Sequence, residues 1–292
     1  MDENREPVVN TEQKSNGGKT TKIAVIVAAI VIVCIAAYFG ITKVVIPNKN
    51  YNAAVALMNE GKYEEAIAVF EALDGYKDSA ENAKRLFIKI AEVGDYVCFG
   101  AYEQDKDTSD GKESVEWQVL AKEDNKILVI SKYVLDAKPY NTELWYVTWE
   151  TCTLRTWLNK TFLDEAFSEA EQSMIRTTEV SADKNPDYRT NPGNDTKDKI
   201  FLLSINEAEK YFASDEARMC VPTAYAKANG AWTYDGYEVD GEATCWWWLR
   251  SPGYFQGSAA NVYVDGGVRS SGNYVSYVHA CVRPALWINL DS

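Results

Sequence analysis

The sequence predicts an α+β protein in which a large mixed domain follows a membrane-spanning segment and a short helical hairpin. Three observations predict this organisation. Residues 23–42 carry no charged side chain, apolar residues from Tyr51 to Leu73 recur at intervals of three and four, and the chain after Gly94 changes to short β-type runs. These runs surround a few helices without regular strand-helix-strand alternation, which favours α+β over a doubly wound parallel sheet.

The composition is that of a globular chain with an acidic surface. Of the 292 residues, 46% are apolar, which is too many for a largely disordered protein, and the formal net charge is -13. Such a charge repels nucleic acid, so we expect no nucleic-acid partner. The six cysteines include no Cys-x-x-Cys pair and the chain has one histidine, so we expect no metal site and no cofactor. The formation of one or two disulfides stays an open alternative.

Residues 23–42 are the expected membrane-spanning helix. The run from Ile23 to Ile41 contains 19 uncharged residues, enough to cross a hydrocarbon core of roughly 30 Å. A cleaved signal peptide is the alternative, but its apolar region usually has only about 7–15 residues and ends in a small-x-small site. Basic residues are more frequent before the run than after it, so residues 1–22 are expected to form a cytoplasmic tail. The protein is then a single-pass protein of the cell membrane with its C-terminal domain outside.

Residues 50–91 are expected to form a helical stalk. Gly61-Lys62 interrupts the apolar spacing, which predicts two helices of about ten residues each, and residues 78–91 supply a third. The order Ala54, Leu57, Gly61, Tyr63, Ala66, Phe70 resembles one tetratricopeptide unit. A single unit cannot form the groove of a solenoid, which favours a spacer over the alternative of a peptide-binding element.

The large domain is expected to occupy residues 94–292. The expected strands are Tyr96–Gly100, Glu116–Ala121, Lys126–Ser131 and Ile200–Leu203. The expected helices are Leu154–Asn159, Ala166–Ile175 and Asn206–Phe212.

Motifs late in this domain carry a resemblance to a known group. They are Trp246-Trp-Trp-Leu-Arg-Ser-Pro-Gly, Gly272 and Val282-Arg-Pro-Ala-Leu-Trp-Ile, with Trp117-Gln-Val-Leu and Phe201-Leu-Leu-Ser upstream. Together they resemble an uncharacterised bacterial domain family whose tail is similar to the C-type lectin-like fold of variable proteins of diversity-generating retroelements. The resemblance implies a domain in which the N- and C-terminal strands pair and a C-terminal segment displays a ligand-binding face.

Residues 254–281 are the candidate variable region that the resemblance implies. In such proteins template adenines are mutated, and an AAC codon randomised at its adenines cannot encode Lys, Glu, Gln, Met or Trp. Of the 28 positions, only Gln256 carries one of these five residue types. The competing explanation is that any loop rich in Gly, Ser and Tyr contains few Lys and Glu residues.

The same region has the composition of a binding surface. Tyr, Ser, Gly and Asn fill half of the 28 positions, and these types combine rigid amphipathic rings with adaptable hydrogen bonding. Strand alternation predicts Val262, Val264 and Val275 inside, with Tyr263, Tyr274 and Ser276 outside. The residues expected to contact the ligand are Tyr254, Phe255, Ser258, Tyr263, Arg269, Ser270, Ser271, Asn273, Tyr274, Ser276, Tyr277 and His279.

The residues around this region are expected to be scaffold. Trp246, Trp247 and Trp248 cannot all point one way on a strand, so at least one should pack in the core. Arg250 and Arg283 are expected to tie loops together through backbone or carboxylate bonds. An oxygen-rich stretch is interpreted as an ordinary solvated loop rather than a cation site. It contains Asp183, Asn185, Asp187, Asn191, Asn194 and Asp195.

The sequence therefore predicts a binding protein with no catalytic residues, whose partner is a protein or a glycan. One alternative is a cell-envelope enzyme of the formylglycine-generating type, whose chemistry needs a reactive cysteine pair such as Cys245 and Cys281. The other alternative is a structural envelope protein that acts through its helical stalk.

Overall fold

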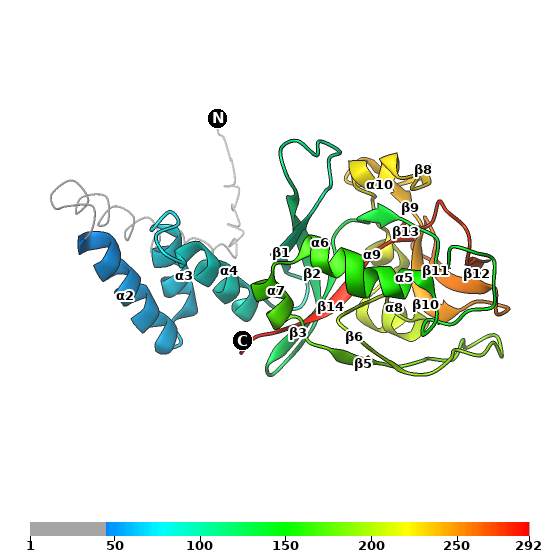
Figure 1. The fold of residues 1–292 in the computed structure, drawn as a ribbon, viewed down its shortest axis with the longest axis horizontal. Coiled ribbons are helices and arrows are strands. Elements are labelled where there is room, and N and C mark those ends of the chain that lie inside the picture. The colour runs from blue at the N-terminus through cyan, green and yellow to red at the C-terminus, as the bar shows by residue number, and fades with distance from the viewer. Residues whose placement is uncertain (1–44, 292) are drawn as a thin grey trace, which may run out of the picture. The chain divides into compact units, whose positions relative to one another are not determined.

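The computed structural model describes residues 45–291, with the side chain of Val45 left aside (Figure 1). The expected cytoplasmic tail and membrane-spanning segment, residues 1–42, lie outside the described residues. Within the described residues, no helix combines the length and apolar character that crossing a membrane requires. The chain divides into two compact units, one up to Leu86 and one from Phe87 onward.

The first unit is helical. Helix α2 covers Val45–Asn59, α3 covers Tyr63–Glu71 and α4 begins at Ser79 and continues to Ile90. Gly61 adopts a φ of +75° between α2 and α3, which confirms the predicted interruption at Gly61-Lys62. The assignment of this unit to the tetratricopeptide group stays a prediction.

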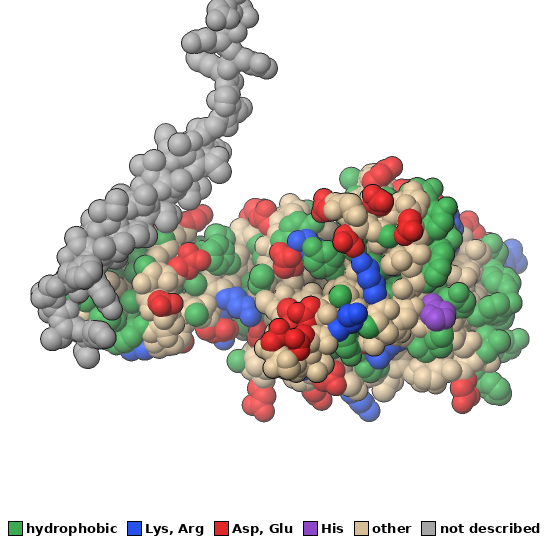
Figure 2. Space-filling view, turned by 90° about the horizontal axis from the view of Figure 1, so that it is seen from above, with side chains coloured by type: hydrophobic (Ala, Val, Ile, Leu, Met, Phe, Trp, Pro, Cys, Tyr) green, Lys and Arg blue, Asp and Glu red, His purple; other side chains and the backbone are tan. Residues whose placement is uncertain are grey.

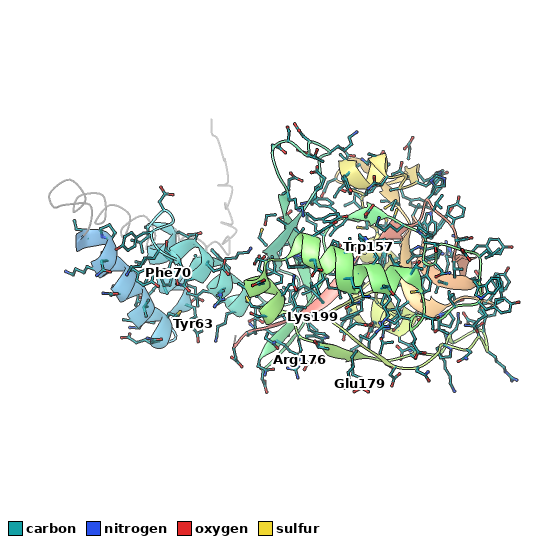
Figure 3. All side chains as sticks on the ribbon, viewed as in Figure 1. Tyr63, Phe70, Trp157, Arg176, Glu179 and Lys199 are labelled. Atoms are coloured by element: carbon teal, nitrogen blue, oxygen red, sulfur yellow. The ribbon has the colours of Figure 1, made fainter. Side chains whose placement is uncertain are left out.

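Aromatic packing holds α2 against α3. Phe70, labelled in Figure 3, is fully buried on α3, and its ring centroid lies 5.7 Å from that of Tyr51 on α2. The Tyr51 hydroxyl donates a hydrogen bond of 2.5 Å to Asp78, which follows α3. Burial of Ala54 and Ala66 lets the two helices approach closely.

The second unit is built around two five-stranded sheets. The first sheet has the order β1-β2-β3-β14-β7, with antiparallel neighbours throughout. Its strands are β1 (Tyr96–Tyr102), β2 (Glu113–Glu123), β3 (Lys126–Ser131), β7 (Ile200–Phe201) and β14 (Ala285–Asn289). The four strand predictions are therefore confirmed in position, although β7 is only two residues long.

The resemblance implied that the C-terminal strand pairs with the first strand of the domain, and this expectation is wrong. Strand β14 lies between β3 and β7. Its residues Ala285–Ile288 are all buried, so this strand is stable only in the interior of the sheet. Strand β1 occupies an edge of the same sheet, where its alternating burial pattern fits a half-exposed position.

The second sheet has the order β12-β11-β10-β13-β4. Its strands are β4 (Asp136–Ala137), β10 (Trp247–Pro252), β11 (Ser258–Val262), β12 (Val268–Tyr274) and β13 (Cys281–Val282). Two hairpins lie outside the sheets, β5–β6 (Thr178–Val180 and Thr196–Asp198) and β8–β9 (Thr233–Val239 and Glu242–Cys245). Strand β12 is an edge of the second sheet, and the candidate variable region runs from before β11 to β13.

Helices pack around the sheets (Figure 1). They are α5 (Thr153–Trp157), the π-turn η1 (Leu158–Phe162), α6 (Leu163–Ala166), α7 (Glu169–Met174), α8 (Ile205–Tyr211), α9 (Asp215–Arg218) and α10 (Ala224–Ala228). The predicted single helix 166–175 is wrong at its start, because Phe167 is extended and Ser168 caps a new helix through a capping box with Glu171. A second capping box, Ser204 with Glu207, starts α8.

The tryptophan run lies in the core with all three rings buried. Trp246 and Trp248 share one face of the strand, with their ring centroids 4.9 Å apart, whereas Trp247 packs on the other face against Phe212 at 6.5 Å. Both faces of β10 are therefore covered, which accounts for burial of all three side chains. The domain is α+β, with helices placed around two largely antiparallel sheets.

Candidate binding face

A bulge in the edge strand shapes the candidate variable region. Strands β11 and β12 pair Ala259 with Asn273 and Asn261 with Arg269, so three residues of β12 face Ala260 alone. Gly272 lies in this bulge with a φ of +67°. A Cβ atom there would lie 1.9 Å from the carbonyl oxygen of Ala259, so only glycine fits.

Asn185 holds the bulge in place. Its buried amide donates hydrogen bonds to the carbonyl oxygens of Pro252 at 2.7 Å and Ser270 at 2.8 Å. On the other side, the Tyr254 amide donates to the carbonyl of Ser271 at 3.0 Å. The interpretation of residues 183–195 as an ordinary solvated loop is therefore wrong for Asn185, whose side chain has backbone partners that no local pattern could reveal.

One aromatic group covers the start of the region. The ring centroids of Tyr188 and Tyr254 lie 6.3 Å apart, those of Tyr254 and Phe255 4.7 Å apart, and those of Phe255 and Tyr274 5.9 Å apart. A side-chain hydrogen bond with Tyr274 raises the pKa of Tyr254. Four rings from three separate segments thus form one cluster whose members restrain each other.

A second aromatic group covers the end of the region. Tyr277 packs on Trp246 with a centroid separation of 5.6 Å and contacts the ring of His279 at 5.7 Å. His279 is tied to the turn before β8, since its Nδ1 lies 2.9 Å from the carbonyl oxygen of Gly230. Trp232 donates its backbone N–H to the His279 carbonyl and stacks on Tyr234.

A third exposed apolar segment lies beside the region, and sequence reasoning did not find it. Leu144, Trp145 and Tyr146 are 55%, 70% and 74% exposed. Two backbone hydrogen bonds attach their loop to the variable region, from Asn141 to Val275 at 2.9 Å and from Val147 to Gln256 at 3.3 Å. The only local signal was the Leu-Trp-Tyr run itself, which follows the polar residues Asn141-Thr-Glu.

These groups together form what we term the aromatic face. It consists of Leu144, Trp145, Tyr146, Tyr188, Trp232, Tyr234, Tyr237, Tyr254, Tyr274, Tyr277 and Val278. These are eleven of the fourteen large hydrophobic side chains that are exposed among residues 45–291; the other three are Phe87, Val93 and Tyr96. Figure 2 shows hydrophobic side chains gathered beside the histidine. Exposed apolar groups are therefore concentrated around the candidate region rather than spread over the domain.

The predicted contact residues differ in accessibility. The exposed ones are Tyr254, Arg269, Ser271, Tyr274, Tyr277 and His279, and the half-buried ones are Phe255, Tyr263, Ser270, Asn273 and Ser276. The predicted inward positions Val262, Val264 and Val275 are all buried, as strand alternation requires.

The prediction that Ser258 contacts the ligand is wrong, because this residue is 2% exposed and cannot contact a ligand on the surface. Its hydroxyl accepts a hydrogen bond from the Phe255 amide and donates one to the Phe255 carbonyl, at 3.2 and 2.8 Å. Its backbone carbonyl accepts from Gly253. Ser258 thus closes the turn that displays Tyr254 and Phe255.

The two scaffold arginines are buried and tie loops together, as predicted. Arg250 donates to the carbonyl of Leu202 at 2.9 Å and forms a two-pronged ion pair with Glu207. Arg283 donates to the carbonyl of Ser131 at 3.0 Å, and its guanidinium lies over the ring of Trp247 at 5.1 Å.

The five cysteines within residues 45–291 are free thiols. Burial raises the pKa of Cys152 to about 12 and that of Cys220 to about 11. Burial followed by the hydrogen bond with Cys281 raises the pKa of Cys245 well above its usual range. At neutral pH the thiols of Cys152, Cys220 and Cys245 are therefore protonated, and thiols in that state are poor nucleophiles.

Carboxylates that could share a metal ion gather elsewhere. In the part of the chain that the structure describes, Glu103, Asp105 and Glu113 form the one group of ligating side chains that lie close enough together. None of these residues belongs to the aromatic face. Burial raises the pKa of Glu103, and its carboxylate accepts a hydrogen bond from the Lys106 amide at 2.7 Å.

Comparison with known proteins gives one match. A family described as "Domain of unknown function (DUF6273)" matches residues 124–290. No curated protein and no solved structure matches the chain. The matched residues contain the whole aromatic face.

Proposed function

The chain belongs to the DUF6273 family, and since its matched residues contain the whole aromatic face, we propose that this domain is a ligand-binding module rather than an enzyme. The observation that carries the proposal is the concentration of exposed large hydrophobic side chains on one set of loops. Exposed apolar patches on a folded domain mark interaction sites, and tyrosine and tryptophan are the side chains that most often dominate binding energy.

The construction of the face supports binding over catalysis. Its rings come from the 141–150 loop, the 181–195 loop, the β8–β9 hairpin and the candidate variable region, and hydrogen bonds between these segments hold the rings in place. A surface arranged before the partner arrives loses less conformational entropy on binding.

The enzyme alternative receives less support. Chemistry of the formylglycine-generating type would need a reactive thiol, whereas Cys245 is buried and its pKa is raised. Among the described residues, the hydrogen bonds of its side chain are with Cys281 and the carbonyl of Cys220, and neither group is a general base. The other alternative, a structural protein that acts through its stalk, rests on helices α2 and α3, whose buried side chains pack on each other.

The partner of the proposed module is a protein or a glycan outside the cell membrane, with residues 23–42 as the anchor and the N-terminus in the cytoplasm. We assign the domain a C-type lectin-like character, supported by the second sheet that carries the displayed segment, although β14 pairs with β3 and β7 and not with β1. Diversification of residues 254–281 by a retroelement is supported by Gln256. Gln256 is the one residue in the region whose type adenine mutagenesis cannot produce. Its side-chain amide bridges two backbone carbonyls, as expected of a scaffold residue.

The nucleotide sequence tests the diversification. We expect a near-copy of the segment encoding residues 254–281, with AAC or AAT in place of the codons for exposed positions such as Tyr274 and Ser271. The Gln256 codon is expected to be the same in both copies. A genome without such a copy would contradict diversification while leaving the binding function intact.

Site-specific photocrosslinking tests the binding function. p-Benzoylphenylalanine is placed at Tyr274 in one variant and at Tyr96 in a matched control, in full-length protein produced in the cells from which the sequence derives. Both side chains are 52% exposed, but only Tyr274 belongs to the aromatic face. We expect a discrete adduct after irradiation from the first variant and not from the second, read as a mass shift on gels and by mass spectrometry.

Equal labelling from both positions, or none from Tyr274, would refute the aromatic face as the binding surface. An additional double variant, Tyr254→Ala with Tyr274→Ala, measures how much affinity for the partner these two side chains provide. Loss of two exposed aromatic anchors of about 2 kcal/mol each corresponds to weakening of roughly a thousand-fold. The folded state should persist, because both side chains are exposed.

A further inference from the structure

A polar pocket lies beside the aromatic face, between the 141–151 loop and the 191–194 turn. Its volume is about 420 Å³, within the range of small-molecule sites of roughly 300–1,000 Å³. The lining residues are Tyr146, Thr148, Glu150, Thr151, Asn191, Gly193, Asn194 and Gln256. One of them, Gln256, belongs to the candidate variable region, so the pocket adjoins the proposed binding surface.

Gln256 joins the two walls of the pocket. Its side-chain amide donates one hydrogen bond to the carbonyl of Val147 and one to the carbonyl of Asn191, both at 3.0 Å. Gly193 allows the walls to approach, because a Cβ atom there would lie 2.7 Å from the side chain of Thr148. The pocket is therefore held open at a defined width by contacts that exist without a ligand.

Several polar atoms of the lining have no partner within the described residues. The Gln256 amide oxygen accepts no hydrogen bond, since both hydrogen bonds of this side chain use its amide nitrogen. Asn194 donates its nitrogen to Glu150 at 3.0 Å, which leaves its own oxygen and one Glu150 oxygen open. Asn191 accepts from Gly193 and leaves its amide nitrogen open. The pocket thus offers both acceptors and donors to a ligand.

The lining also limits the charge and polarity of the ligand. The described residues that line it include no Lys, Arg or His, and the one carboxylate among them, Glu150, opposes an anionic ligand. Amides and hydroxyls dominate the walls, so a purely apolar ligand would leave them unsatisfied. The exposed ring of Tyr146 at the rim adds one flat apolar surface. A neutral ligand with many hydroxyl groups and one apolar C–H face meets all three conditions, and a pyranose ring is such a ligand.

We infer that this pocket binds one pyranose unit of an uncharged glycan. The C–H face of the ring lies on Tyr146, and its hydroxyls bond to Glu150, Asn191, Asn194 and Gln256. The inference rests on the proposed binding function and names the class of partner. No bond is made or broken in the ligand.

The test measures binding of the full-length protein to immobilised oligosaccharides. The probes are cellotriose, mannotriose and tri-N-acetylchitotriose as uncharged glycans, trigalacturonic acid as an anionic one, and tetra-arginine as a cationic peptide. We expect at least one uncharged trisaccharide to bind and trigalacturonic acid not to bind. Tyr146→Ala should weaken the binding at least ten-fold, and Tyr96→Ala, the matched exposed aromatic outside the face, should leave it unchanged.

A second variant separates the pocket from the rest of the surface. Glu150→Gln keeps the shape of the side chain and removes its charge, so binding of uncharged glycans should fall several-fold while some binding of trigalacturonic acid is gained. Absence of binding to all three uncharged glycans, an equal response to Tyr146→Ala and Tyr96→Ala, or preferential binding of tetra-arginine would each overturn the inference.

The outcome is distinguishable from failure of the proposed function. If no glycan binds but the photocrosslinker at Tyr274 still gives its specific adduct, the pocket inference fails and the binding function stands. If the adduct is also absent, both fail.

Discussion

Replacing Arg250 with alanine is expected to lower the free energy of unfolding of the domain by about 3–5 kcal/mol. Arg250 is buried, and its guanidinium donates to the carbonyls of Ser181 at 3.2 Å and Leu202 at 2.9 Å besides pairing with Glu207. Removing the guanidinium leaves these acceptors without a donor in a region with little water, and such groups cost more than the lost bond itself. Since these contacts join the 181–195 loop and α8 to β10, the loop that carries Asn185 would also loosen.

The measurement is urea unfolding of the full-length protein, followed by tryptophan fluorescence. All nine tryptophans lie beyond residue 94, so the signal reports the large domain alone. The matched control is Arg269→Ala, because the Arg269 side chain is 46% exposed and pairs with Asp265 on the surface. We expect that control to cost at most about 1 kcal/mol.

If the alanine variant does not fold, Arg250→Lys keeps the charge but loses the two-pronged geometry, and it should still cost more than the Arg269 control. Equal effects of the Arg250 and Arg269 variants would show that the buried arginine is not what joins these loops.

Replacing Gly272 with alanine is expected to destabilise the domain by about 3–5 kcal/mol, combining a left-handed backbone cost of about 1–3 kcal/mol with a steric cost of similar size. The steric part arises because the new Cβ would overlap the Ala259 carbonyl across the bulge. Relief requires separation of β11 and β12, and this would move Ser270 and Ser271, whose carbonyls hold Asn185 and Tyr254.

Gly241→Ala is the matched control for this second variant. Gly241 also has a positive φ, +80°, but an added Cβ would meet no atom within 4 Å. Alanine there should cost only the backbone part, about 1–3 kcal/mol. The difference between the two variants in the same urea titration isolates the clash at the bulge. A difference below about 1 kcal/mol would mean that β12 adjusts freely and that the bulge does not constrain the face.

Local patterns were sufficient for much of the fold. Strand alternation placed Val262, Val264 and Val275 inside, and all three are buried. The interruption at Gly61 was also predicted. It depends on a glycine with a positive φ between two apolar repeats, and this backbone preference is local. The start of α7 was missed, since the Ser168 capping box competes with an apolar spacing that continues through it.

The binding face was predicted only in part. Tyr254, Tyr274 and Tyr277 are exposed as expected, but Ser258 is internal because its hydroxyl closes a turn within its own segment. Trp145 and Tyr146 were not predicted, although they are among the most exposed side chains of the face.

The sequence by itself determined the positions of four strands of the first sheet, the inward side of Val262, Val264 and Val275, and the binding-surface composition of residues 254–281. Those properties follow from side-chain period and backbone preference, both of which act over a few residues. Only the tertiary structure decided that the loops carrying Tyr146, Tyr188 and Trp232 join this region in one face. Their positions depend on hydrogen bonds between groups far apart in the chain, such as Asn185 to Ser270 and Gln256 to Val147, and a backbone carbonyl gives no sign in the sequence of which distant side chain will bind it.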